Sequence, residues 1–560
     1  MRKGFLFVLM CALLIGVAWS QTRSRRSKKY TGALTSGAIS ALHGVDDGRI
    51  KADIRFLSSD VLEGRGTGAR GGDIAAHYIA NQLEGAGLKP LGAKGTYFQE
   101  VPMVGITTMP ESTLVLTTPK QSLNLKQWDE CVITDETGKP RNDVGSDLVF
   151  VGYGIRAPEY HWDDYAGLDV QGKVLLMLVN EPPSQDENFF KAKALTYYGR
   201  WTYKYEEAAR LGAAGVILIH KTDMASYGWD VVRNSWSGER SYLRDDANPK
   251  LKLAAWIQLD VARKMLADAG KDLDQLMKDA QQRGFKPVPL PIKAEAHVVS
   301  NIRPFSSNNV IGEVEGSDPK LKDQAVVITA HYDHLGIRPE LKGDNIYNGA
   351  LDNASGTAML MEMARAAASA QLKPKRSIIF AAVTGEEQGL LGSEYLGQHP
   401  PIPNANLSLD INFDSIAPLG IPKEVSAGGY DRTTFASVFQ RTAADFGMTI
   451  QPPAHPESGG YYRSDHFSFA RVGVPAFSVD AGGRFEGRPE EWVKARQKRN
   501  SENYHEPGDE FQEDGDYRTN GVMARFGLAL AWQAANLPSL VQWRQGDEFE
   551  AARKAEVGQQ

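Results

Sequence analysis

Between residues 296 and 540, short apolar runs alternate with segments of helical pattern. The apolar runs read AVVITAHYD, SIIFAAVTGEE, LSLDINFDS and GVPAFSVD, and GTAMLMEMARAAASA between the first two has helical spacing. Strands that are apolar throughout and alternate with helices are typical of a mostly parallel sheet with helices on both faces. The sequence therefore predicts an α/β fold with a mostly parallel, mixed central sheet flanked by helices.

Residues 110–290 have a different character. STLVLTT, DLVFVGYGI and KVLLMLV are typical of short strands rich in β-branched residues. A chain of 560 residues is several times longer than a typical domain. We therefore predict a β-rich domain over residues 109–291, inserted into a discontinuous α/β domain of residues 45–108 and 292–545. Residues 546–560 are predicted to be a polar tail.

The first residues have the plan of a secretory signal peptide. Arg2 and Lys3 precede the apolar run FLFVLMCALLIGVA, and the small residues near AWS suit a cleavage site. A membrane anchor is the alternative, but about 14 apolar residues are too few to span a bilayer comfortably. We expect residues 1–20 to be removed on export to the periplasm or the medium, with no stable membrane anchor. Cys131 then has no cysteine partner for an intrachain disulfide.

The charge balance argues against a nucleic-acid partner. The formal net charge is −6, and no long basic stripe occurs outside the first thirty residues. Nucleic-acid binding normally needs such a basic patch. With 42% hydrophobic and 24% charged residues, the composition is that of an ordinary globular protein.

Two pairs of adjacent glutamates stand in different settings. Glu206 and Glu207 lie in the middle of a predicted helix near Lys204 and Arg210, where charges usually form a solvated face with local ion pairs. Glu386 and Glu387 instead follow directly on an apolar strand. Ligands of open α/β sheets bind beyond the carboxyl ends of the strands. The sequence therefore predicts a functional role for the second pair alone.

Histidines and carboxylates recur at the expected carboxyl ends of these strands. His331 ends the first strand, and Glu386 and Glu387 follow the next. Asp414 ends the third, while Asp352 and His505 lie in the loops NGALDNASG and NYHEPGDEF. Histidine and carboxylate ligands suit zinc, and less often manganese or cobalt. Their recurrence at one edge of the sheet predicts a metal site.

Each of these residues also has a plainer interpretation. Asp352 could cap the helix that begins near Ala354, because Asp and Asn favour that position. His331 could be a buried histidine with its hydrogen bonds satisfied, and His505 an ordinary loop residue. Asp414 could lie in a turn at a strand end, as we expect for Asp410. To replace the predicted metal site, all of these plainer interpretations would have to be correct at once at the same edge of the sheet.

The motifs AHYDH, NGALDNASG, TGEEQGLLGSEY, INFDS, RSDHFSF and YHEPGDEF occur in this order. In this order they resemble the M28-type family of di-zinc aminopeptidases and carboxypeptidases, over residues 50–105 and 296–540. The central segment, with GYGIRAPEYHWDDYAGLDVQGKVLLMLVNEPP and AARLGAAGVILIH, looks like the protease-associated (PA) domain that many members carry as an insertion. The resemblance implies the zinc-peptidase fold.

The resemblance also assigns roles to the motif residues. It implies two Zn²⁺ per chain, with Glu386 as general base, and with Asp333 holding the ring of His331 from outside the metal site. A tyrosine ahead of Ser-Asp-His would steady the oxyanion, and Tyr461 matches better than Tyr462. The metal ligands implied are His331 and Asp414 for one zinc, Glu387 and His505 for the other, and Asp352 bridging the two.

A peptide is therefore the expected substrate, and the expected activity is that of an exported exopeptidase. The interval between His331 and Asp352 favours an aminopeptidase over a glutamate carboxypeptidase, where it is shorter. The segment AGGRFEGRPEEWVKARQKRN carries both charge signs and does not separate these two activities. The alternatives are a glutamate-carboxypeptidase-like dipeptidase, a non-catalytic receptor-like module on the same fold, and a single-zinc glutaminyl cyclase.

Overall fold

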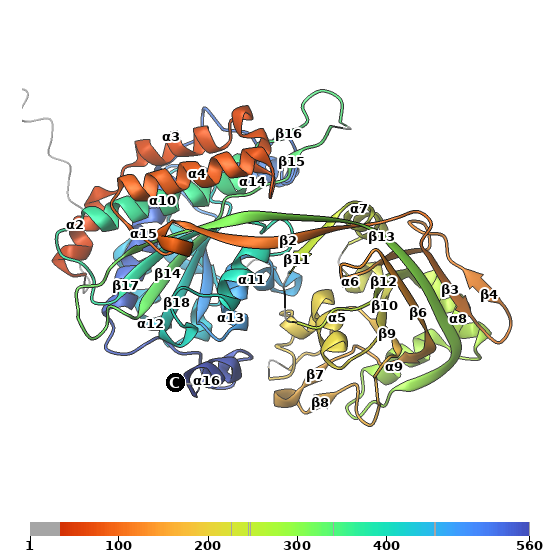
Figure 1. The fold of residues 1–560 in the computed structure, drawn as a ribbon. Coiled ribbons are helices and arrows are strands. Elements are labelled where there is room, and N and C mark those ends of the chain that lie inside the picture. The colour runs from red at the N-terminus through yellow and green to blue at the C-terminus, as the bar shows by residue number, and fades with distance from the viewer. Residues whose placement is uncertain are drawn as a thin grey trace, which may run out of the picture.

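The computed structural model describes residues 34–558, apart from residues 187, 226, 245, 247, 340, 453 and 454. The predicted signal peptide, residues 1–20, lies outside the described residues. Figure 1 shows two lobes joined by two long strands, β2 (Phe98–Thr108) and β13 (Val288–Val314). Within the described part of the chain, none of the helices has the length and apolar character needed to cross a membrane.

The first lobe, here called the α/β lobe, is built on a mixed sheet. Four strands run parallel in the order β17-β14-β18-β21. Their bounds are Ser377–Val383 for β17, Ala325–His331 for β14, Leu407–Phe413 for β18 and Ala476–Ala481 for β21. β13 pairs antiparallel with β17 on one side, and β19 (Glu424–Gly428) pairs antiparallel with β21 on the other. The predicted fold class is confirmed.

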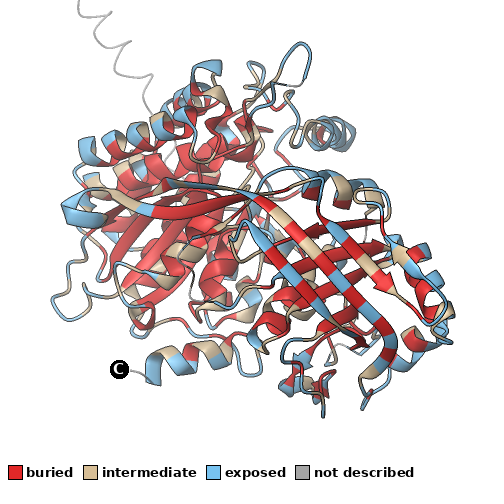
Figure 2. Ribbon diagram, turned by 45° about the vertical axis from the view of Figure 1, so that its right-hand side comes forward, coloured by how far each residue is buried: buried red, intermediate tan, exposed pale blue. Residues whose placement is uncertain are grey.

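Both faces of this sheet are buried, which explains why its strands are mostly apolar. In β14, Val326 and Ile328 belong to one hydrophobic core and Val327 to another on the opposite face. The first core lies under α10 (Ser355–Ser369) and α15 (Arg518–Asn536), and the second under α11 (Leu391–Gln398) and α13 (His466–Arg471). Figure 2 shows the strands buried and the outer faces of the covering helices exposed. The carboxyl ends of the strands are thereby the part of the sheet left to carry polar side chains.

Further helices extend the first core near the start of the described chain. They are α2 (Ser36–Gly44), α3 (Asp47–Leu57) and α4 (Arg70–Gly85), with the short helix η1 (Asp60–Arg65) between the last two. α2 and α3 contact both α10 and α15, and α4 contacts α10. The loop after η1 reaches the sheet, because Gly66 forms a β-bridge with His334. Residues far apart in sequence are thus joined beside the end of β14.

The second lobe, here called the inserted lobe, has its own sheet and its own cores. Its strands β9 (Val174–Leu178), β10 (Gly215–His220) and β12 (Leu253–Gln258) run parallel, and β5 (Cys131–Thr134) is antiparallel to β12. The buried residues of its two cores all lie within residues 114–298. Separate cores support the predicted insertion of residues 109–291. The division of the chain into two domains at these bounds stays a prediction.

The predicted boundary at residues 291–292 falls inside a continuous strand. β13 pairs with β6 (Arg141–Phe150) in the inserted lobe through its first half, and with β2 and β17 in the α/β lobe through its second half. One strand therefore serves both sheets, and no linker separates them at this point. Its burial alternates along the first half and becomes continuous near the end, as one buried face gives way to two.

The C-terminal segment differs from the predicted polar tail. It contains the helix α16 (Glu550–Gly558), which Figure 1 shows beside the α/β lobe. Glu548 is buried, where it accepts hydrogen bonds from Arg432 (2.7 Å) and from the Tyr462 hydroxyl (2.8 Å). The buried Arg553 donates to the backbone carbonyls of Asn404 and Leu407. Two charged residues of the predicted polar tail are thus paired within the fold, while Lys554 of the same helix is exposed.

The prediction for Glu206 and Glu207 is wrong in its main point. Both lie in α5 (Trp201–Arg210), but the side chain of Glu207 is only 5% exposed. Glu207 pairs with Arg210, as a local ion pair, and lies 3.5 Å from Arg156. Glu206 reaches the other lobe, where Arg471 lies 3.2 Å away. Both glutamates thus have fixed arginine partners, although Glu206 and Arg471 are partly exposed.

Candidate metal centre

His331, the last residue of β14, lies between two carboxylates. Its Nε2 atom is 3.2 Å from Asp352 Oδ1 and 3.3 Å from Asp414 Oδ1. Asp414 follows β18, the strand beside β14, so parallel neighbours bring the two side chains to one edge of the sheet. Ser415 and Ser464 donate to the two carboxylate oxygens of Asp414, at 3.0 Å and 2.8 Å. The plainer interpretation of Asp414, as a residue in a turn at a strand end, does not account for these contacts.

Asp410 also departs from its predicted place in a turn. It lies within β18 and is fully buried, where Thr329 donates to its Oδ1 atom (2.9 Å). Burial raises the pKa of Asp410 well above its ordinary value. This carboxyl group belongs to the interior of the sheet.

Asp352 lies between two histidines from different parts of the chain. Its Oδ1 atom faces His331, and its Oδ2 atom is 3.2 Å from His505 Nε2. Although burial opposes ionisation, the close contacts with these histidines hold the pKa of Asp352 far below its usual range. Asp509 accepts from the Asp352 backbone N–H (3.0 Å) and fixes the chain there. The arrangement suits a bridging carboxylate.

The helix-capping interpretation of Asp352 is wrong. The neighbouring Asn353 accepts the hydrogen bond from Gly356 N (2.8 Å) at the start of α10. The backbone before Asp352 bends sharply at Gly349, whose φ of 57° is left-handed. A Cβ atom at Gly349 would lie 2.6 Å from the His334 ring, so the close approach of this ring also requires glycine.

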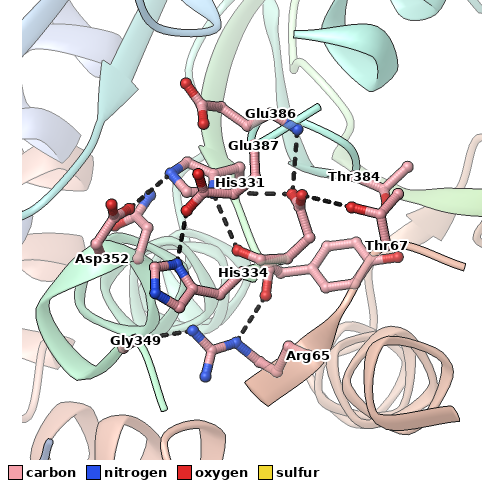
Figure 3. A network of polar contacts seen from close by, with 12 residues as sticks. Arg65, Thr67, His331, His334, Gly349, Asp352, Thr384, Glu386 and Glu387 are labelled. Carbon is pink, nitrogen blue, oxygen red and sulfur yellow. Dashed lines mark hydrogen bonds and ion pairs between the residues drawn. The ribbon is translucent and has the colours of Figure 1, made fainter. Parts of the chain in front are cut away.

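Glu387 contacts two histidines. Its Oε1 atom is 2.6 Å from His334 Nδ1, and its Oε2 atom is 3.1 Å from His505 Nε2. Against burial and the charge of Asp352, the hydrogen bond with His334 and the close contact with His505 lower the pKa of Glu387. Figure 3 shows the Glu387 carboxylate pointing into the cluster with His334 and Asp352. Glu387 is thus held as an ionised group.

Glu386 lies beside Glu387 but is held differently. Its backbone N–H donates to Asp333 Oδ1 (3.2 Å), while its carboxylate forms no hydrogen bond or ion pair with another described residue. Figure 3 shows this carboxylate turned away from the network below it. Burial raises the pKa of Glu386 well above its usual value, against the attraction of His331, and the charge of Glu387 adds to the shift. A free carboxylate with a raised pKa is suited to proton transfer.

Asp333 lies close to His331, as predicted, but its carboxylate has other partners. The nearest acceptor to His331 Nδ1 is the Asp333 backbone oxygen, at 3.2 Å, whereas the carboxylate Oδ1 is 3.8 Å away. Thr67 donates to Asp333 Oδ2 (2.8 Å), and Glu386 N donates to Oδ1. The carboxylate therefore fixes the turn that carries Glu386, and the backbone carbonyl supports the His331 ring.

Arg65 holds two loops of the centre in place and was not predicted from the sequence. It is fully buried and donates from Nε to the Tyr332 carbonyl and from Nη2 to the Gly349 carbonyl, both at 2.8 Å. Burial lowers the pKa of Arg65 to about 10, and the cluster carboxylates oppose this shift. The side chain therefore stays charged beside an acidic cluster.

The structure does not support the oxyanion role predicted for Tyr461. Its hydroxyl donates to the Ala476 backbone carbonyl (3.0 Å), and its ring packs against His466. The alternative, Tyr462, donates to the buried Glu548. Both hydroxyls thus donate to groups outside the metal centre.

A different tyrosine lies at the mouth of the centre. The Tyr504 ring stacks on His505 with centroids 3.9 Å apart, and 58% of the residue is exposed. Burial of its hydroxyl end and the carboxylates of Asp352 and Glu387 raise the pKa of Tyr504, so the phenol keeps its proton. Its position directly before His505 in NYHEPGDEF was the signal available in the sequence.

The donor set fits a pair of divalent ions. The side chains form two groups, and inside each group the ligand atoms lie within 4.8 Å of one another. The first group is His331, Asp352 and Asp414, and the second is His334, Asp352 and Glu387. His505 Nε2 is buried without a well-aligned hydrogen bond although two carboxylate oxygens lie 3.1 and 3.2 Å away, which is the environment of a metal ligand. His334 was not predicted, and it competes with His505 for the second group.

Residues 309–531 match the family model described as Peptidase family M28. A "Probable zinc metalloprotease" of Pyrenophora tritici-repentis is 41% identical over 114 residues, which are 20% of this chain and 22% of that protein. Another from Pyricularia oryzae is 30% identical over 272 residues, 42% of this chain and 52% of its own. The chain therefore covers less than two thirds of the length of these curated relatives.

Among solved structures, the "Aminopeptidase from Aneurinibacillus sp. strain AM-1" is similar along most of the chain. The match covers 90% of this chain and 97% of that one, with a TM-score of 0.49 and 20% sequence identity. The family match over residues 309–531 confirms the resemblance predicted from the motifs.

Proposed function

Residues 309–531 of this chain form a domain of peptidase family M28, and from this premise we propose that the protein is a di-zinc exopeptidase that removes N-terminal residues from peptides. The observation that carries the proposal is the meeting of His331, Asp352 and Glu387 beside a free Glu386 carboxylate. A receptor-like module on this fold would be expected to have lost the metal ligands, and the intact ligand set argues against that alternative.

The proposed ligand sets follow the contacts of the cluster. His331 and Asp414 would hold one Zn²⁺, Glu387 and His505 the other, and Asp352 would serve both. When bound, two zinc ions lower the pKa of a water molecule and polarise the carbonyl of the scissile bond. His334 would orient Glu387 from its other side, as hydrogen-bonded partners of metal ligands commonly do.

Glu386 would carry the proton in the reaction. It would accept the proton that the attacking water loses and deliver it to the amine that leaves. Asp333 fixes the backbone of Glu386, so the carboxylate is supported without being used as a ligand. Tyr504 would donate its phenol proton in a hydrogen bond to the oxygen on which negative charge develops. Its raised pKa keeps that donor available.

The wider proposals concern export and specificity. We propose that the chain is exported after removal of residues 1–20, and that the inserted lobe is a PA-like domain beside the substrate path. Contact between the lobes at Leu195 and Pro456 (3.1 Å) supports this placement, because residues 456–463 lead to Ser464, which donates to Asp414. N-terminal analysis of the exported protein tests the cleavage.

A substrate panel tests the activity. Aminoacyl p-nitroanilides and N-acylated dipeptides are offered to the purified protein with and without EDTA, and Zn²⁺ is then returned. We expect hydrolysis of the aminoacyl substrates, loss with the chelator and recovery with zinc. Cleavage of the N-acylated dipeptides alone would replace the aminopeptidase proposal by a carboxypeptidase. Absence of bound zinc together with absence of any EDTA-sensitive activity would favour the receptor-like alternative.

A further inference from the structure

The strand β18 is an exception to the apolar interior of the sheet. Along it, apolar residues alternate with the fully buried polar residues Ser408, Asp410 and Asn412. Leu409 and Ile411 belong to the core under α10 and α15, so the polar residues between them face the other side, towards α11 and α13. Buried polar groups are costly unless they are hydrogen-bonded, so this row needs partners.

Asp410 and Asn412 belong to a chain of four contacts that ends on a ligand of the proposed metal centre. Thr329 Oγ1, on the neighbouring strand β14, lies 2.9 Å from Asp410 Oδ1 and 3.1 Å from Asn412 Oδ1. Asn412 Nδ2 lies 2.7 Å from Ser464 Oγ, and Ser464 Oγ lies 2.8 Å from Asp414 Oδ2. The chain thus joins the interior of the sheet to the edge that carries the metal centre.

The four contacts need more hydrogen atoms than the three middle residues supply. The hydroxyls of Thr329 and Ser464 have one hydrogen each. The amide of Asn412 supplies one more, because its oxygen faces Thr329 and its nitrogen faces Ser464. Turning the amide over reverses its direction but leaves the count unchanged. The fourth hydrogen must therefore come from a carboxyl group at one end of the chain.

The buried end at Asp410 is better suited to hold this hydrogen. Asp414 lies 3.3 Å from His331 and must be ionised to bind a metal. Asp410 Oδ2 is buried without a hydrogen-bond partner among the described residues, so a negative charge there would be costly. Burial raises the pKa of Asp410 well above its ordinary value, against the hydrogen bond with Thr329, and the charge of Asp465 adds to the rise.

We propose that Asp410 is a positioning residue of the metal centre, which holds a proton and donates it in a hydrogen bond to Thr329. Thr329 then donates to Asn412, and Asn412 donates to Ser464. Ser464 is left to give its one hydrogen to Asp414 Oδ2. Every hydrogen of the chain therefore points towards the metal centre. The inference rests on the proposed function and adds a residue that supports one of its metal sites.

An ionised Asp410 would favour the opposite direction. Thr329 would give its hydrogen to Asp410, and the amide of Asn412 would turn its nitrogen towards Thr329. The oxygen of Asn412 would then face Ser464 and compete with Asp414 for the Ser464 hydrogen. A neutral donor at position 410 thus supports Asp414, whereas a charge at that position does not.

Substitutions at position 410 separate these two cases. Asp410→Asn keeps a neutral donor, the amide N–H, whereas Asp410→Leu removes it. Titration with a zinc indicator gives the zinc affinity of both variants, beside Ser464→Ala, which removes the donor to Asp414. Asp53→Asn is the control, at another buried carboxyl group of the same lobe, which accepts from the Tyr78 hydroxyl (2.7 Å).

Infrared spectra of the metal-free proteins report the proton itself, because a protonated carboxyl group has a carbonyl band that an ionised carboxylate lacks. We expect the spectrum of Asp410→Asn at neutral pH to lack one such band of the wild type. This readout depends neither on bound zinc nor on turnover.

The zinc affinities should follow the order of the chain. We expect Asp410→Asn to stay within about twofold of the wild type, because one neutral donor replaces another. Asp410→Leu should weaken binding at one site by about 3- to 10-fold, since the hydrogen bond that sets the direction is lost. Ser464→Ala should weaken it by about 10- to 100-fold, as loss of a ligand's own partner does. The control should keep the wild-type affinity.

The proposal is overturned if Asp410→Asn keeps every carboxylic-acid band, or if it weakens zinc binding as much as Asp410→Leu does. Wild-type zinc affinity in Asp410→Leu would also overturn it. If Asp410→Leu does not fold, Thr329→Val breaks the same link from the other side and should weaken zinc binding equally. Failure of the proposed function has a different signature, since the wild type itself would then bind no zinc.

Discussion

The chain contains two pairs of adjacent glutamates, and their surroundings are opposite. In α5, Glu207 is buried against Arg210 and Arg156, and Glu206 faces Arg471. After β17, Glu387 is held by histidines, and the Glu386 carboxylate has no partner among the described residues. The first pair is neutralised by permanently charged arginines. The second is surrounded by groups that can also bind a metal.

The difference lies in the chemistry of the partners. Arginine cannot serve as a metal ligand and keeps its proton, so an arginine–carboxylate pair is a finished structural contact. Histidine offers a nitrogen lone pair to a metal and can exchange its proton. Two carboxylates side by side are thus compatible with either role, and the neighbours decide which role they have.

Removing metal should have the largest effect on the second pair. We expect EDTA to abolish peptide hydrolysis and added Zn²⁺ to restore it, because Glu387, Asp352 and their histidines would then lack the ions that they are proposed to hold. The same treatment should leave the contact between Glu206 and Arg471 unchanged. Full activity in a protein shown to be free of metal would contradict the account.

Replacing Glu386 should have the next largest effect. General acid–base catalysis contributes about 10²- to 10⁴-fold, so Glu386→Gln should lower kcat by that factor. Glu206→Gln is the matched change in the first pair and should leave kcat within about twofold, since its charge only joins the lobes. Equal rates for both variants would contradict the conclusion that the surroundings of each glutamate pair decide its role.

The two histidines beside Glu387 should differ in their effect on metal binding. His505→Ala removes the nitrogen that touches both Asp352 and Glu387, and should lower the zinc content towards one ion per chain. His334→Ala should weaken zinc affinity by about 10- to 100-fold, as loss of a supporting partner does. Titration with a zinc indicator measures both, and the reverse order would make His334 the ligand.

Glu207→Gln should affect stability without affecting the metal. Its loss leaves Arg210 and Arg156 without their carboxylate partner, which costs about 1 kcal/mol because both arginines are about half exposed to water. Urea unfolding followed by tryptophan fluorescence should show this loss, while zinc content and kcat stay at wild-type values. A loss of zinc in this variant would be unexpected.

Glu206→Gln should have the smallest effect on stability. Arg471 keeps Glu394 at 3.5 Å, and both side chains of the Glu206–Arg471 pair are partly exposed, so we expect a loss below about 1 kcal/mol. The same urea experiment checks it beside Glu207→Gln. A larger effect than that of Glu207→Gln would mean that the lobes depend on this contact.

The sheet could be predicted from the sequence because its strands are buried on both faces. In Val326, Val327 and Ile328, neighbouring residues face different cores, and the strand therefore reads as one apolar run. His331, Glu387 and Asp414 could be predicted for a related reason, since each directly follows or ends such a run. Parallel pairing then brings them together.

The features that could not be predicted depend on contacts between distant segments. Glu206 and Arg471 are far apart in sequence, and no local sequence pattern predicts that they form a pair. Glu548 and Arg553 contribute to the polar composition of residues 546–560, but the fold buries their side chains against partners in other segments. Tyr461 was chosen by its place before a motif, whereas hydroxyl direction depends on the fold. Tyr504 and His334 lie one and three residues from predicted ligands, and this closeness was the signal that the sequence offered for them.

The most direct test of the central claim measures zinc content and kcat together for Glu386→Gln and Glu387→Gln. The account predicts that Glu386→Gln keeps two zinc ions per chain and loses turnover, whereas Glu387→Gln loses zinc from one site. If both variants kept wild-type zinc and wild-type rates, or if Glu386→Gln lost zinc as Glu387→Gln does, the two glutamates would not have separate roles.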